Sequence, residues 1–292
     1  MGNPSIIAIG GPTASGKTEL AIALAQKHQT EIISFDSRQL YKELSIGVAR
    51  PSETELALCI HHGIAEHSIL NPISAGEYAR LYRPTVDYLL ETKGCAILVG
   101  GTGLYLQHLL YDLDEIPSAQ ESHRQQVNQR YMDIGLSGLV NDLLSLDPEA
   151  GMSIDLQNPA RVKRAFELCI ALNKPLAEIY KGSKNPYFHS AQLQVLGIEW
   201  DRTALYQRIN QRVDTMMKAG LLQEVQSLIP NADLPVLKTV GYTELIDYLS
   251  NTTTLEQAVE RIKQHSRNYA KRQITYFNRQ FETKWLKKDA II

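Results

Sequence analysis

The chain has 292 residues, of which 43% are hydrophobic and 21% charged, as is usual for a soluble globular protein. No stretch approaches 18 consecutive apolar residues, so a membrane span is not expected. The N-terminus lacks the basic and long apolar regions of a secretory signal, and we therefore expect a cytoplasmic protein. The cysteines are scattered and have no paired spacing, which argues against a disulfide framework or a zinc site; they are Cys59, Cys95 and Cys169.

The net charge of −2 conceals an uneven distribution. From Arg261 onward there are nine Lys/Arg and two Asp/Glu, a net charge of +7, whereas residues 1–260 carry a net charge of −9. A basic tail on an acidic body suggests contact with a polyanion. A solvated charged helix explains the same charges, and on charge alone both interpretations stay open.

Strand and helix patterns alternate along the first hundred residues. Short apolar runs ending in glycine or a polar residue predict buried parallel strands, and apolar residues three and four apart predict the helices between them. This alternation is typical of a parallel α/β sheet. The predicted elements are strand Ile6–Ile9, helix Lys17–Lys27, strand Glu31–Phe35, helix Ser74–Leu90 and strand Cys95–Val99.

The strand signal disappears between Leu113 and Gly182, where helical patterns alternate with proline-containing turns. We therefore predict a mostly helical insertion, with helices over Leu139–Leu146 and Arg161–Leu172. A strand over Gln194–Glu199 then returns the chain to the sheet. Four amphipathic helices follow it, over Arg202–Ala219, Leu221–Leu228, Tyr242–Leu249 and Leu255–Phe281.

Residues 11–18 read GPTASGKT and match the pattern G-x-x-x-x-G-K-[ST] between a predicted strand and a predicted helix. Glycines let the backbone turn tightly and aim N–H groups at phosphate oxygens, and the helix N-terminus adds partial positive charge. Lys17 supplies a full charge, and the Thr18 hydroxyl can ligate Mg²⁺. The predicted phosphate loop consists of Gly11, Pro12, Thr13, Ala14, Ser15, Gly16, Lys17 and Thr18.

This motif indicates a phosphate but does not identify a nucleotide. ATPases and kinases usually hold Mg²⁺ with an acidic residue at the end of a core strand, whereas the strand AILVGGTG ends in glycines. Asp36, in FDSRQLY, does end a predicted strand. It could cap a turn, but a role in the site is favoured because ligands of open α/β sheets bind at the carboxyl ends of strands.

Six motifs occur in order between about Ser5 and Phe281, nearly the whole chain: GPTASGKT, FDSRQLY, GGTGLYLQ, RINQRVDTMMKAGLLQEV, LKTVGY and RNYAKRQITYF. Together they resemble the tRNA dimethylallyltransferase family. The resemblance implies transfer of a dimethylallyl group from dimethylallyl diphosphate to N6 of adenosine 37, in tRNAs that read codons beginning with U, with Mg²⁺ as cofactor. It also implies that the phosphate loop holds the diphosphate of the prenyl donor.

The same resemblance implies a P-loop kinase-like α/β core in residues 1–112 and 188–292. Residues 113–187 would form the helical insertion, which grips the anticodon stem-loop. We expect a monomer that does not bind membranes.

The resemblance also assigns roles to individual residues. Asp36 would take the proton of the adenine amine. Lys17, Thr18 and Arg212 would stabilise the departing diphosphate, and Arg212 is preferred to Arg208 for this role. The tRNA contacts would come from Asp36, Ser37, Arg38, Gln39, Thr102, Arg124, Ala160, Arg161, Val162, Lys163, Arg164, Arg267 and Lys271.

Three further expectations concern side chains and glycines near these contacts. Gln39 can offer its amide to an adenine edge. The glycines around Thr102 allow a close backbone approach. In the basic tail, Tyr269 and Tyr276 could stack or pack, whereas Phe277 is expected in the core.

Three other functions fit parts of the pattern. An adenylate isopentenyltransferase would prenylate a free nucleotide, but it would need neither a large helical insertion nor a basic tail. A small-molecule P-loop kinase lacks a convincing catalytic set in this chain. A non-catalytic RNA-binding or nucleotide-binding module would not explain Asp36 between a phosphate loop and a recognition stretch.

Overall fold

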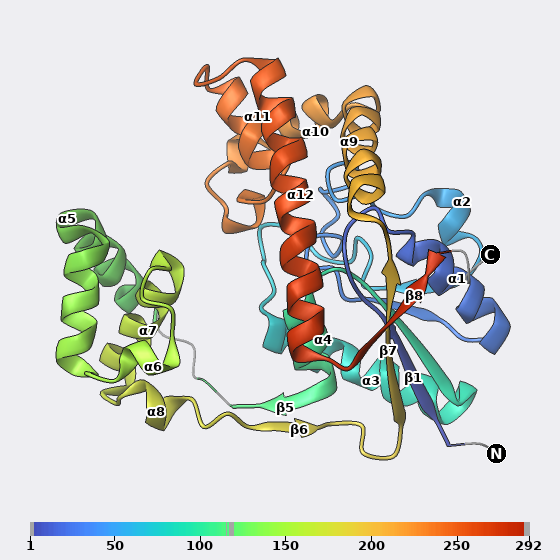
Figure 1. Cartoon of the computed structure of the whole chain (residues 1–292), viewed down its shortest axis with the longest axis horizontal. Coiled ribbons are helices and arrows are strands. Elements are labelled where there is room, and N and C mark those ends of the chain that lie inside the picture. The colour runs from blue at the N-terminus through green and yellow to red at the C-terminus, as the bar shows by residue number, and fades with distance from the viewer. Residues whose placement is uncertain (1–2, 115, 117–119, 289–292) are drawn as a thin grey trace. The chain divides into compact units, whose positions relative to one another are not determined.

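The computed structural model in Figure 1 describes residues 3–114, 116 and 120–288. The chain divides into two compact units, which we call the core unit (residues 1–110 and 187–292) and the helical unit (residues 111–186). The predicted domain boundaries lie within two residues of these positions. Among the described residues, no helix is both long and apolar enough to cross a lipid bilayer.

The core unit is built on one six-stranded sheet in the order β3-β2-β4-β1-β7-β8. Every strand pair in it is parallel, which confirms the predicted α/β class. The strands are β1 (Ser5–Ile9), β2 (Ile32–Ser34), β3 (His61–His62), β4 (Cys95–Val99), β7 (Gln192–Glu199) and β8 (Thr283–Lys287).

The two central strands explain why the sheet forms. In β1 four of the five residues are buried, and in β4 all five are, as expected for strands covered on both faces. They pair in parallel from Ser5 opposite Cys95 to Ile9 opposite Val99, so their carboxyl ends coincide. β2 pairs with β4 up to Ser34 opposite Val99. The segments following β1, β2 and β4 therefore leave the sheet at the same edge.

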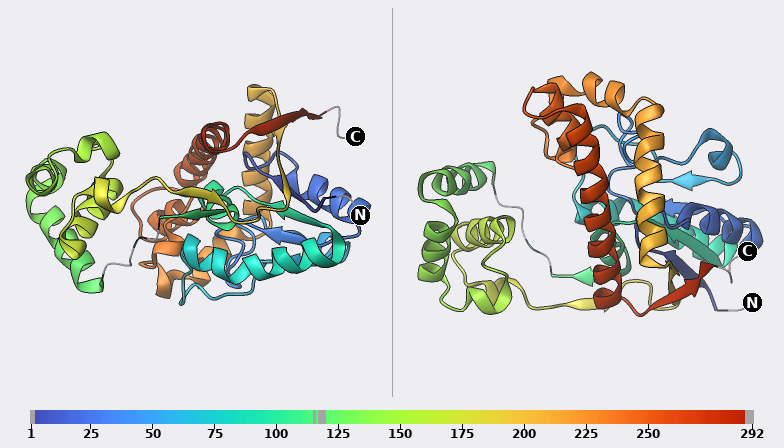
Figure 2. Two further views of the ribbon diagram at one scale, coloured as in Figure 1. Left: turned by 90° about the horizontal axis from the view of Figure 1, so that it is seen from below. Right: turned by 45° about the horizontal axis from the view of Figure 1, so that its top comes forward.

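Helices flank this sheet and gather at its carboxyl edge, where α12 lies beside α9 (Figure 2). A capping box of Ser74 and Glu77 starts α3, and Gly94, with φ of 70°, ends it. The helices of the core unit are α1 (Lys17–His28), α2 (Glu53–Leu56), α3 (Ala75–Lys93), α4 (Gly103–Leu110), α9 (Arg202–Lys218), α10 (Leu221–Ser227), α11 (Tyr242–Leu249) and α12 (Leu255–Gln280), with 3₁₀ turns η1 (Ile229–Asn231) and η2 (Pro235–Leu237).

The sequence patterns missed both edge strands of the sheet. β3 has only two residues, too few for a periodic signal. β8, with the sequence TKWLK, lies inside the basic tail and pairs with β7 from Thr283 opposite Val195 to Lys287 opposite Glu199. Its Trp285 ring covers Gly197, where a Cβ atom would lie 2.5 Å from the ring. Part of the basic tail is therefore sheet, not the continuous charged helix that its composition suggests.

The helical unit has its own hydrophobic core, and its helical character agrees with the expectation for the insertion. Its first helix is longer than predicted and is interrupted at Gly135, with φ of 69°. A two-stranded antiparallel sheet, which the patterns missed, joins the two ends of the unit. Its elements are β5 (Tyr111–Leu113), α5 (Glu121–Leu146), α6 (Ala150–Ser153), α7 (Pro159–Leu172), α8 (Leu176–Ile179) and β6 (Lys184–Pro186).

Candidate active site

The phosphate loop, residues 11–18, joins β1 to α1 in a backbone conformation that its glycines permit. Gly11 and Gly16 have φ of 121° and 95°, in the region that favours glycine, and Ala14 also has a positive φ of 62°. Within the loop, the Ser15 hydroxyl donates to the Pro12 carbonyl over 2.9 Å. The turn places the N-terminus of α1 at the carboxyl edge of the sheet, where the helix dipole favours an anion.

Side chains from distant parts of the chain hold the outward-facing carbonyls of this loop. The Trp200 indole donates to the Ser15 carbonyl over 3.0 Å, and Arg208 Nε donates to the Ala14 carbonyl over 3.0 Å. The Arg208 guanidinium also lies 4.5 Å above the Trp200 ring. Arg208, the less favoured arginine for the diphosphate, is thus engaged with the loop backbone.

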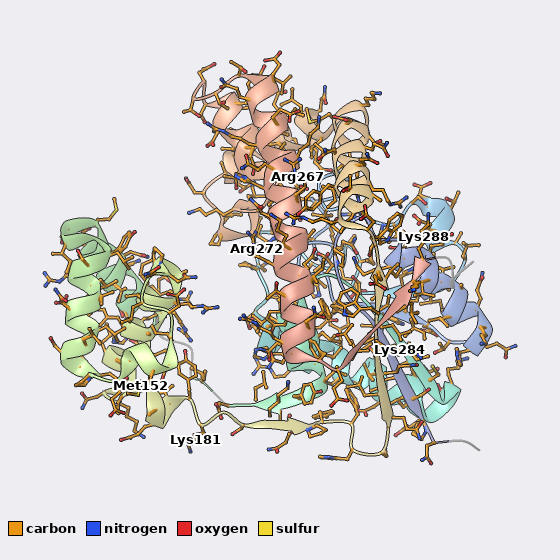
Figure 3. The ribbon with its side chains drawn as sticks, in the orientation of Figure 1. Met152, Lys181, Arg267, Arg272, Lys284 and Lys288 are labelled. Carbon is orange, nitrogen blue, oxygen red and sulfur yellow. The ribbon has the colours of Figure 1, made fainter. Side chains whose placement is uncertain are left out.

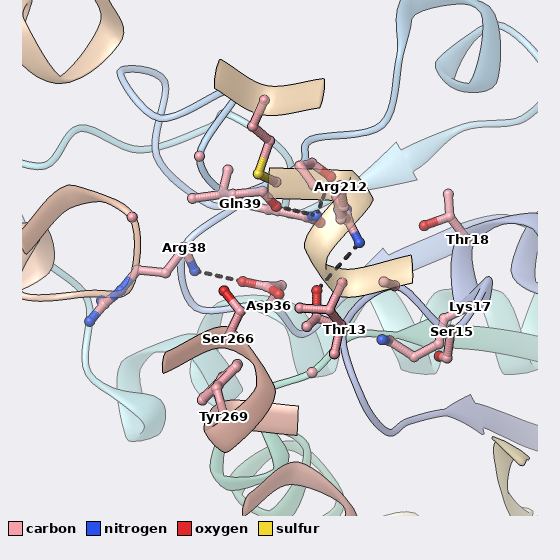
Figure 4. Close-up of a pocket in the computed structure, with 18 of the residues that line it drawn as sticks. Thr13, Ser15, Lys17, Thr18, Asp36, Arg38, Gln39, Arg212, Ser266 and Tyr269 are labelled. Carbon is pink, nitrogen blue, oxygen red and sulfur yellow. Dashed lines mark hydrogen bonds between the residues drawn. The ribbon is translucent and has the colours of Figure 1, made fainter. Parts of the chain in front are cut away.

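Arg212 is placed differently, one helical turn further along α9. Its Nη1 donates to the Thr13 hydroxyl over 3.3 Å, and its side chain lines the same cavity as the phosphate loop (Figure 4). Burial, above all, lowers the pKa of Arg212, and the nearby Asp36 carboxylate opposes that effect. A guanidinium remains protonated in proteins, so Arg212 supplies a fixed positive charge here.

Lys17 is the residue of the loop whose charge is most sensitive to its surroundings. Its Nζ donates to the Pro12 carbonyl over 2.6 Å. Burial of the ammonium lowers the pKa of Lys17 to about 7; the charge of Arg212 lowers it further, whereas Asp36 raises it. With a pKa near 7, a fraction of the Lys17 side chains is neutral amine, and a bound phosphate would raise this pKa so that the amine takes up a proton.

Asp36 lies two residues beyond β2, at the carboxyl edge of the sheet. Its Oδ1 accepts the backbone N–H of Arg38 over 3.0 Å, so Asp36 does form the turn that the simpler interpretation predicted. Its side chain nevertheless lines a cavity of about 550 Å³ together with Lys17 and Arg212 (Figure 4). The turn therefore orients the carboxylate toward the phosphate loop instead of excluding it from the site.

Thr18 begins α1 beside Lys17 and lines the same cavity. No protein group in the described part of the chain hydrogen-bonds its hydroxyl. The described residues contain no group of three or more His, Cys, Asp or Glu side chains that could hold a metal by themselves. The Thr18 hydroxyl and the Asp36 carboxylate of the same cavity are too few ligands for a complete metal site, but their types suit Mg²⁺ that is shared with substrate phosphates.

Thr102 and Ser37 connect the ends of two neighbouring strands. The Thr102 hydroxyl accepts the Ser37 backbone N–H over 3.1 Å and donates to the Ser37 hydroxyl over 3.2 Å. Tyr269 of α12 lines the cavity that contains Asp36, and burial raises the pKa of its hydroxyl to about 12. Thr102 thus links the segment after β4 to the segment after β2.

The glycines around Thr102 make room for side chains of α12, whereas they were expected to make room for a ligand. A Cβ atom on Gly101 would lie 2.2 Å from Gln273 Nε2, and one on Gly103 would lie 2.3 Å from the Tyr276 ring. Side chains of α12 therefore fill the space beside these glycines, where a close approach of the ligand was expected. Phe277 fills the equivalent space above Gly10 and is fully buried, which confirms its predicted place in the core.

The Gln39 amide, which was expected to face an adenine edge, is hydrogen-bonded inside the protein. Its amide Nε2 donates to the carbonyls of Val48 and Ala49, over 3.2 and 3.0 Å, and its Oε1 accepts from the Ser34 hydroxyl. Both donors of the amide are used inside the protein, so in this conformation Gln39 cannot bind an adenine edge in the bidentate manner.

Glu224 on α10 holds the segment that follows Gln39, and sequence reasoning did not single it out. Its carboxylate accepts the backbone N–H groups of Ser45, Ile46 and Gly47 over 2.7 to 3.1 Å, and the Tyr242 hydroxyl over 2.6 Å. The LKTVGY motif thus contributes a buried tyrosine that supports this anchor. A lone Glu in an amphipathic helix carries no sequence signal for such a role.

A second cavity of about 740 Å³ lies against the first, and Arg38 and Tyr269 line both. Ser37, Arg261 and Arg272 also line it. Arg267 and Lys271 lie elsewhere on α12: Arg267 Nη1 donates to Asn210 on α9 over 2.7 Å, and Lys271 is 5.9 Å from the Tyr206 ring. Figure 3 shows Arg267 and Arg272 on α12.

In the helical unit, most of the predicted tRNA-contact residues cluster at the start of α7. Ala160 and Arg161 are exposed, and Asn158 caps their backbone N–H groups. Val162, in contrast, is fully buried in the core of the unit, so its side chain has no access to a ligand.

The remaining predicted cations of this unit have partners within the same unit. Arg124 and Arg164 both pair with Glu167, over 3.3 and 2.8 Å, and Lys163 donates to Asn128 over 3.1 Å.

Comparison with known proteins shows to which family the chain belongs. The family model described as IPP transferase matches residues 39–280. The tRNA dimethylallyltransferase of Flavobacterium johnsoniae is 43% identical over 286 residues, covering 96% of this chain and 92% of its relative. That of Geobacillus thermodenitrificans is 38% identical, covering 96% and 89%.

Two solved structures are similar as well. The tRNA Δ(2)-isopentenylpyrophosphate transferase of Staphylococcus epidermidis has a TM-score of 0.69 at 35% identity, covering 98% of this chain and 94% of that one. A eukaryotic dimethylallyltransferase acting on tRNA has a TM-score of 0.77 at 25% identity, covering 94% and 70%. The family resemblance inferred from the six motifs is confirmed: this chain belongs to the IPP transferase family.

Proposed function

We propose that this protein transfers a dimethylallyl group from dimethylallyl diphosphate to N6 of adenosine 37, in tRNAs that read codons beginning with U. The observation that carries the proposal is the shared cavity of about 550 Å³, where Asp36 meets the phosphate loop, Lys17 and Arg212. The tRNA dimethylallyltransferases among its relatives support the choice of donor and acceptor.

The chemistry follows from this arrangement of charges. The N6 amine attacks the first carbon of the prenyl group, a C–N bond forms, and the bond from that carbon to the diphosphate oxygen breaks. The amine is a weak nucleophile because its lone pair is delocalised into the purine ring. Asp36 accepts the proton that the amine releases, as a general base.

The electron pair of the broken bond leaves with the diphosphate. Lys17, Arg212 and the free loop amides are positioned to stabilise the negative charge that develops there. Because these donors are already fixed by the protein, little reorganisation is needed when the bond breaks.

We also propose Mg²⁺ as the cofactor, held on the protein side by Thr18. The Thr18 hydroxyl and the Asp36 carboxylate line the same cavity, and both are ligand types that suit Mg²⁺, an ion that keeps several waters and is shared with substrate phosphates. When bound, Mg²⁺ neutralises part of the diphosphate charge.

The proposed acceptor is the anticodon stem-loop, in which adenosine 37 is unpaired and can be turned out of the loop at modest energetic expense. Arg38, Arg261 and Arg272 line the second cavity together with Glu244 and Asp247, and Arg261 lies 3.9 Å from Asp247. We propose that these three arginines contact RNA phosphates. The exposed cations of α5 and α7 offer further phosphate contacts. We propose that the enzyme acts as a cytoplasmic monomer.

The test is a transfer assay with labelled dimethylallyl diphosphate, Mg²⁺, and either an anticodon stem-loop or AMP. We expect label in the stem-loop alone, and none when inosine, which lacks the exocyclic amine, replaces adenosine 37. Label in AMP would instead identify an adenylate isopentenyltransferase. Transfer of a phosphoryl group from added ATP to an acceptor would identify a kinase, and absence of any transfer would identify a binding module.

A further inference from the structure

Gln273 is a buried polar residue on α12 that none of the proposed roles uses. It is 5% exposed, and its neighbours on the same helix face are apolar, including Ala270 and Phe277. A buried amide in such a stripe must be hydrogen-bonded, because an unpaired buried polar group is strongly unfavourable. Its partners therefore indicate why it is there.

The two ends of the Gln273 amide bind two different parts of the site. Nε2 donates to the Gly101 carbonyl after β4 over 3.0 Å, and Oε1 accepts the Thr13 backbone N–H of the phosphate loop over 2.9 Å. One planar group thus spans the segments that leave β1 and β4. The position requires a donor and an acceptor a fixed distance apart, which an amide supplies and an ionised carboxylate does not.

The amide also lies next to the candidate base. A Cβ atom on Gly101 would be 2.2 Å from Gln273 Nε2 and 3.8 Å from Asp36 Oδ2, so both side chains border the space above this glycine. Glycine at position 101 is what allows the amide to enter.

Thr13 is held twice, which fixes its orientation. Arg212 binds its hydroxyl over 3.3 Å while Gln273 binds its backbone N–H. Because that N–H points at Gln273, it is not available to a diphosphate, unlike the loop amides that have no such partner. Thr13 therefore acts as an attachment point of the loop.

We propose that Gln273 is a positioning residue, whose amide fixes the phosphate loop to Gly101 and so sets the separation between the leaving diphosphate and Asp36. This inference rests on the proposed function, because it assumes that both groups act in one reaction. We call the two hydrogen bonds of the Gln273 amide, to Thr13 and to Gly101, the Gln273 strut. Misplacement of reacting groups by about 1 Å can lower a rate 100-fold, so loss of this strut should affect catalysis strongly.

Gln273→Met tests the strut because it keeps the length and removes both hydrogen bonds. We expect kcat to fall by about 10- to 100-fold, while the Kd for the stem-loop changes less than about twofold. Wild-type kcat in this variant would overturn the inference. Thermal unfolding of each variant ensures that rates are measured on folded protein.

Gln273→Glu separates positioning from a merely structural role. A protonated carboxyl has the donor and acceptor of the amide, whereas its ionised form cannot donate to the Gly101 carbonyl. The charged or titratable residues that line the cavity together with Gln273 are present in both proteins. They are Lys17, Glu19, Asp36, Arg38, Glu55, His61, Arg208, Arg212 and Tyr269.

We therefore expect the activity of Gln273→Glu, divided by that of wild type, to fall about tenfold or more between pH 6 and pH 9 as the introduced carboxyl ionises. The matched control is Gln223→Glu on α10, which is exposed and outside both cavities, and whose ratio should stay constant. A flat ratio for Gln273→Glu would contradict the inference.

Binding of inorganic pyrophosphate, measured by calorimetry, tests the strut independently of prenyl transfer. We expect Gln273→Met to bind about tenfold more weakly, because the loop loses its attachment. If the wild-type protein transferred no prenyl group, the proposed function would fail, and equal pyrophosphate affinity of wild type and Gln273→Met would then overturn the strut as well.

Discussion

The core unit and the helical unit hold their functional side chains in different ways. In the core unit, Thr13 is fixed by Arg212 and Gln273, about 200 and 260 residues further along the chain. In the helical unit, Arg124 and Arg164 both pair with Glu167, but both of these arginine side chains remain partly exposed at the surface. Catalysis needs geometry fixed to a fraction of an ångström, whereas neutralising phosphates needs charge in about the right place. We therefore expect core substitutions to change kcat, and helical-unit substitutions to change salt-dependent affinity.

The largest effect is expected for Asp36→Ala. Removal of a general base typically lowers a rate about 10²- to 10⁴-fold, while the stem-loop should still bind because the basic surfaces are intact. Single-turnover rates and stem-loop Kd values check this. An equal loss of rate and affinity would assign Asp36 to binding or folding.

Arg212→Ala should lower kcat by about 10²- to 10³-fold, as is typical when one donor to a developing negative charge is lost. Because Arg212 also holds Thr13, pyrophosphate affinity should fall as well. The comparison variant is Arg208→Ala: its guanidinium binds the Ala14 carbonyl and lies on Trp200, so we expect a smaller loss. The reverse order would make Arg208 the diphosphate ligand.

The lowered pKa of Lys17 predicts that pyrophosphate binding depends on pH. Its pKa is about 7 in the free protein, and a bound anion raises it, so binding takes up a proton. Affinity should thus be greatest below pH 7 and weaken above it, by at most about tenfold per pH unit, until the pKa of the complex is reached. Calorimetry from pH 6 to 9 checks this. Lys17→Arg, charged throughout, should retain only the slope due to titration of pyrophosphate itself.

Arg267→Ala should have a moderate effect on stem-loop affinity. We expect this effect to be smaller than the losses of kcat from the core substitutions above and larger than the effect of a substitution in the helical unit. Its guanidinium ties α12 to Asn210 on α9, and its other donors remain for RNA. If it contacts phosphate, stem-loop affinity falls and the salt slope, log Kd against log salt, becomes shallower by about one. An unchanged slope with reduced thermal stability would make Arg267 a structural link only.

The smallest effect is expected in the helical unit. Arg161 is exposed at the start of α7, so Arg161→Ala should weaken stem-loop binding a few-fold and reduce the salt slope by about one, as for a phosphate contact. At saturating stem-loop, kcat should be unchanged. A loss of kcat there would show that the helical unit also positions the reacting base, and the contrast between the units would fail.

The sequence alone determined what depends on short-range chemistry. The apolar runs of β1 and β4 predict central strands, because burial on both faces requires them to be apolar. The phosphate loop was recognisable because its glycines, Lys17 and Thr18 are needed at fixed spacing. Asp36 was a candidate because it follows a strand at the edge where ligands bind.

Tertiary structure decided the features that depend on residues far apart in sequence. It showed that Gly101 and Gly103 admit side chains of α12, that the Gln39 amide is already engaged, and that Glu224 anchors a loop almost 180 residues earlier. It also showed that β8, which contains two lysines and lies in the basic tail, is an edge strand of the sheet. None of these has a local signal, because each arises where one element packs against another and side chains must fill space and satisfy buried polar groups there.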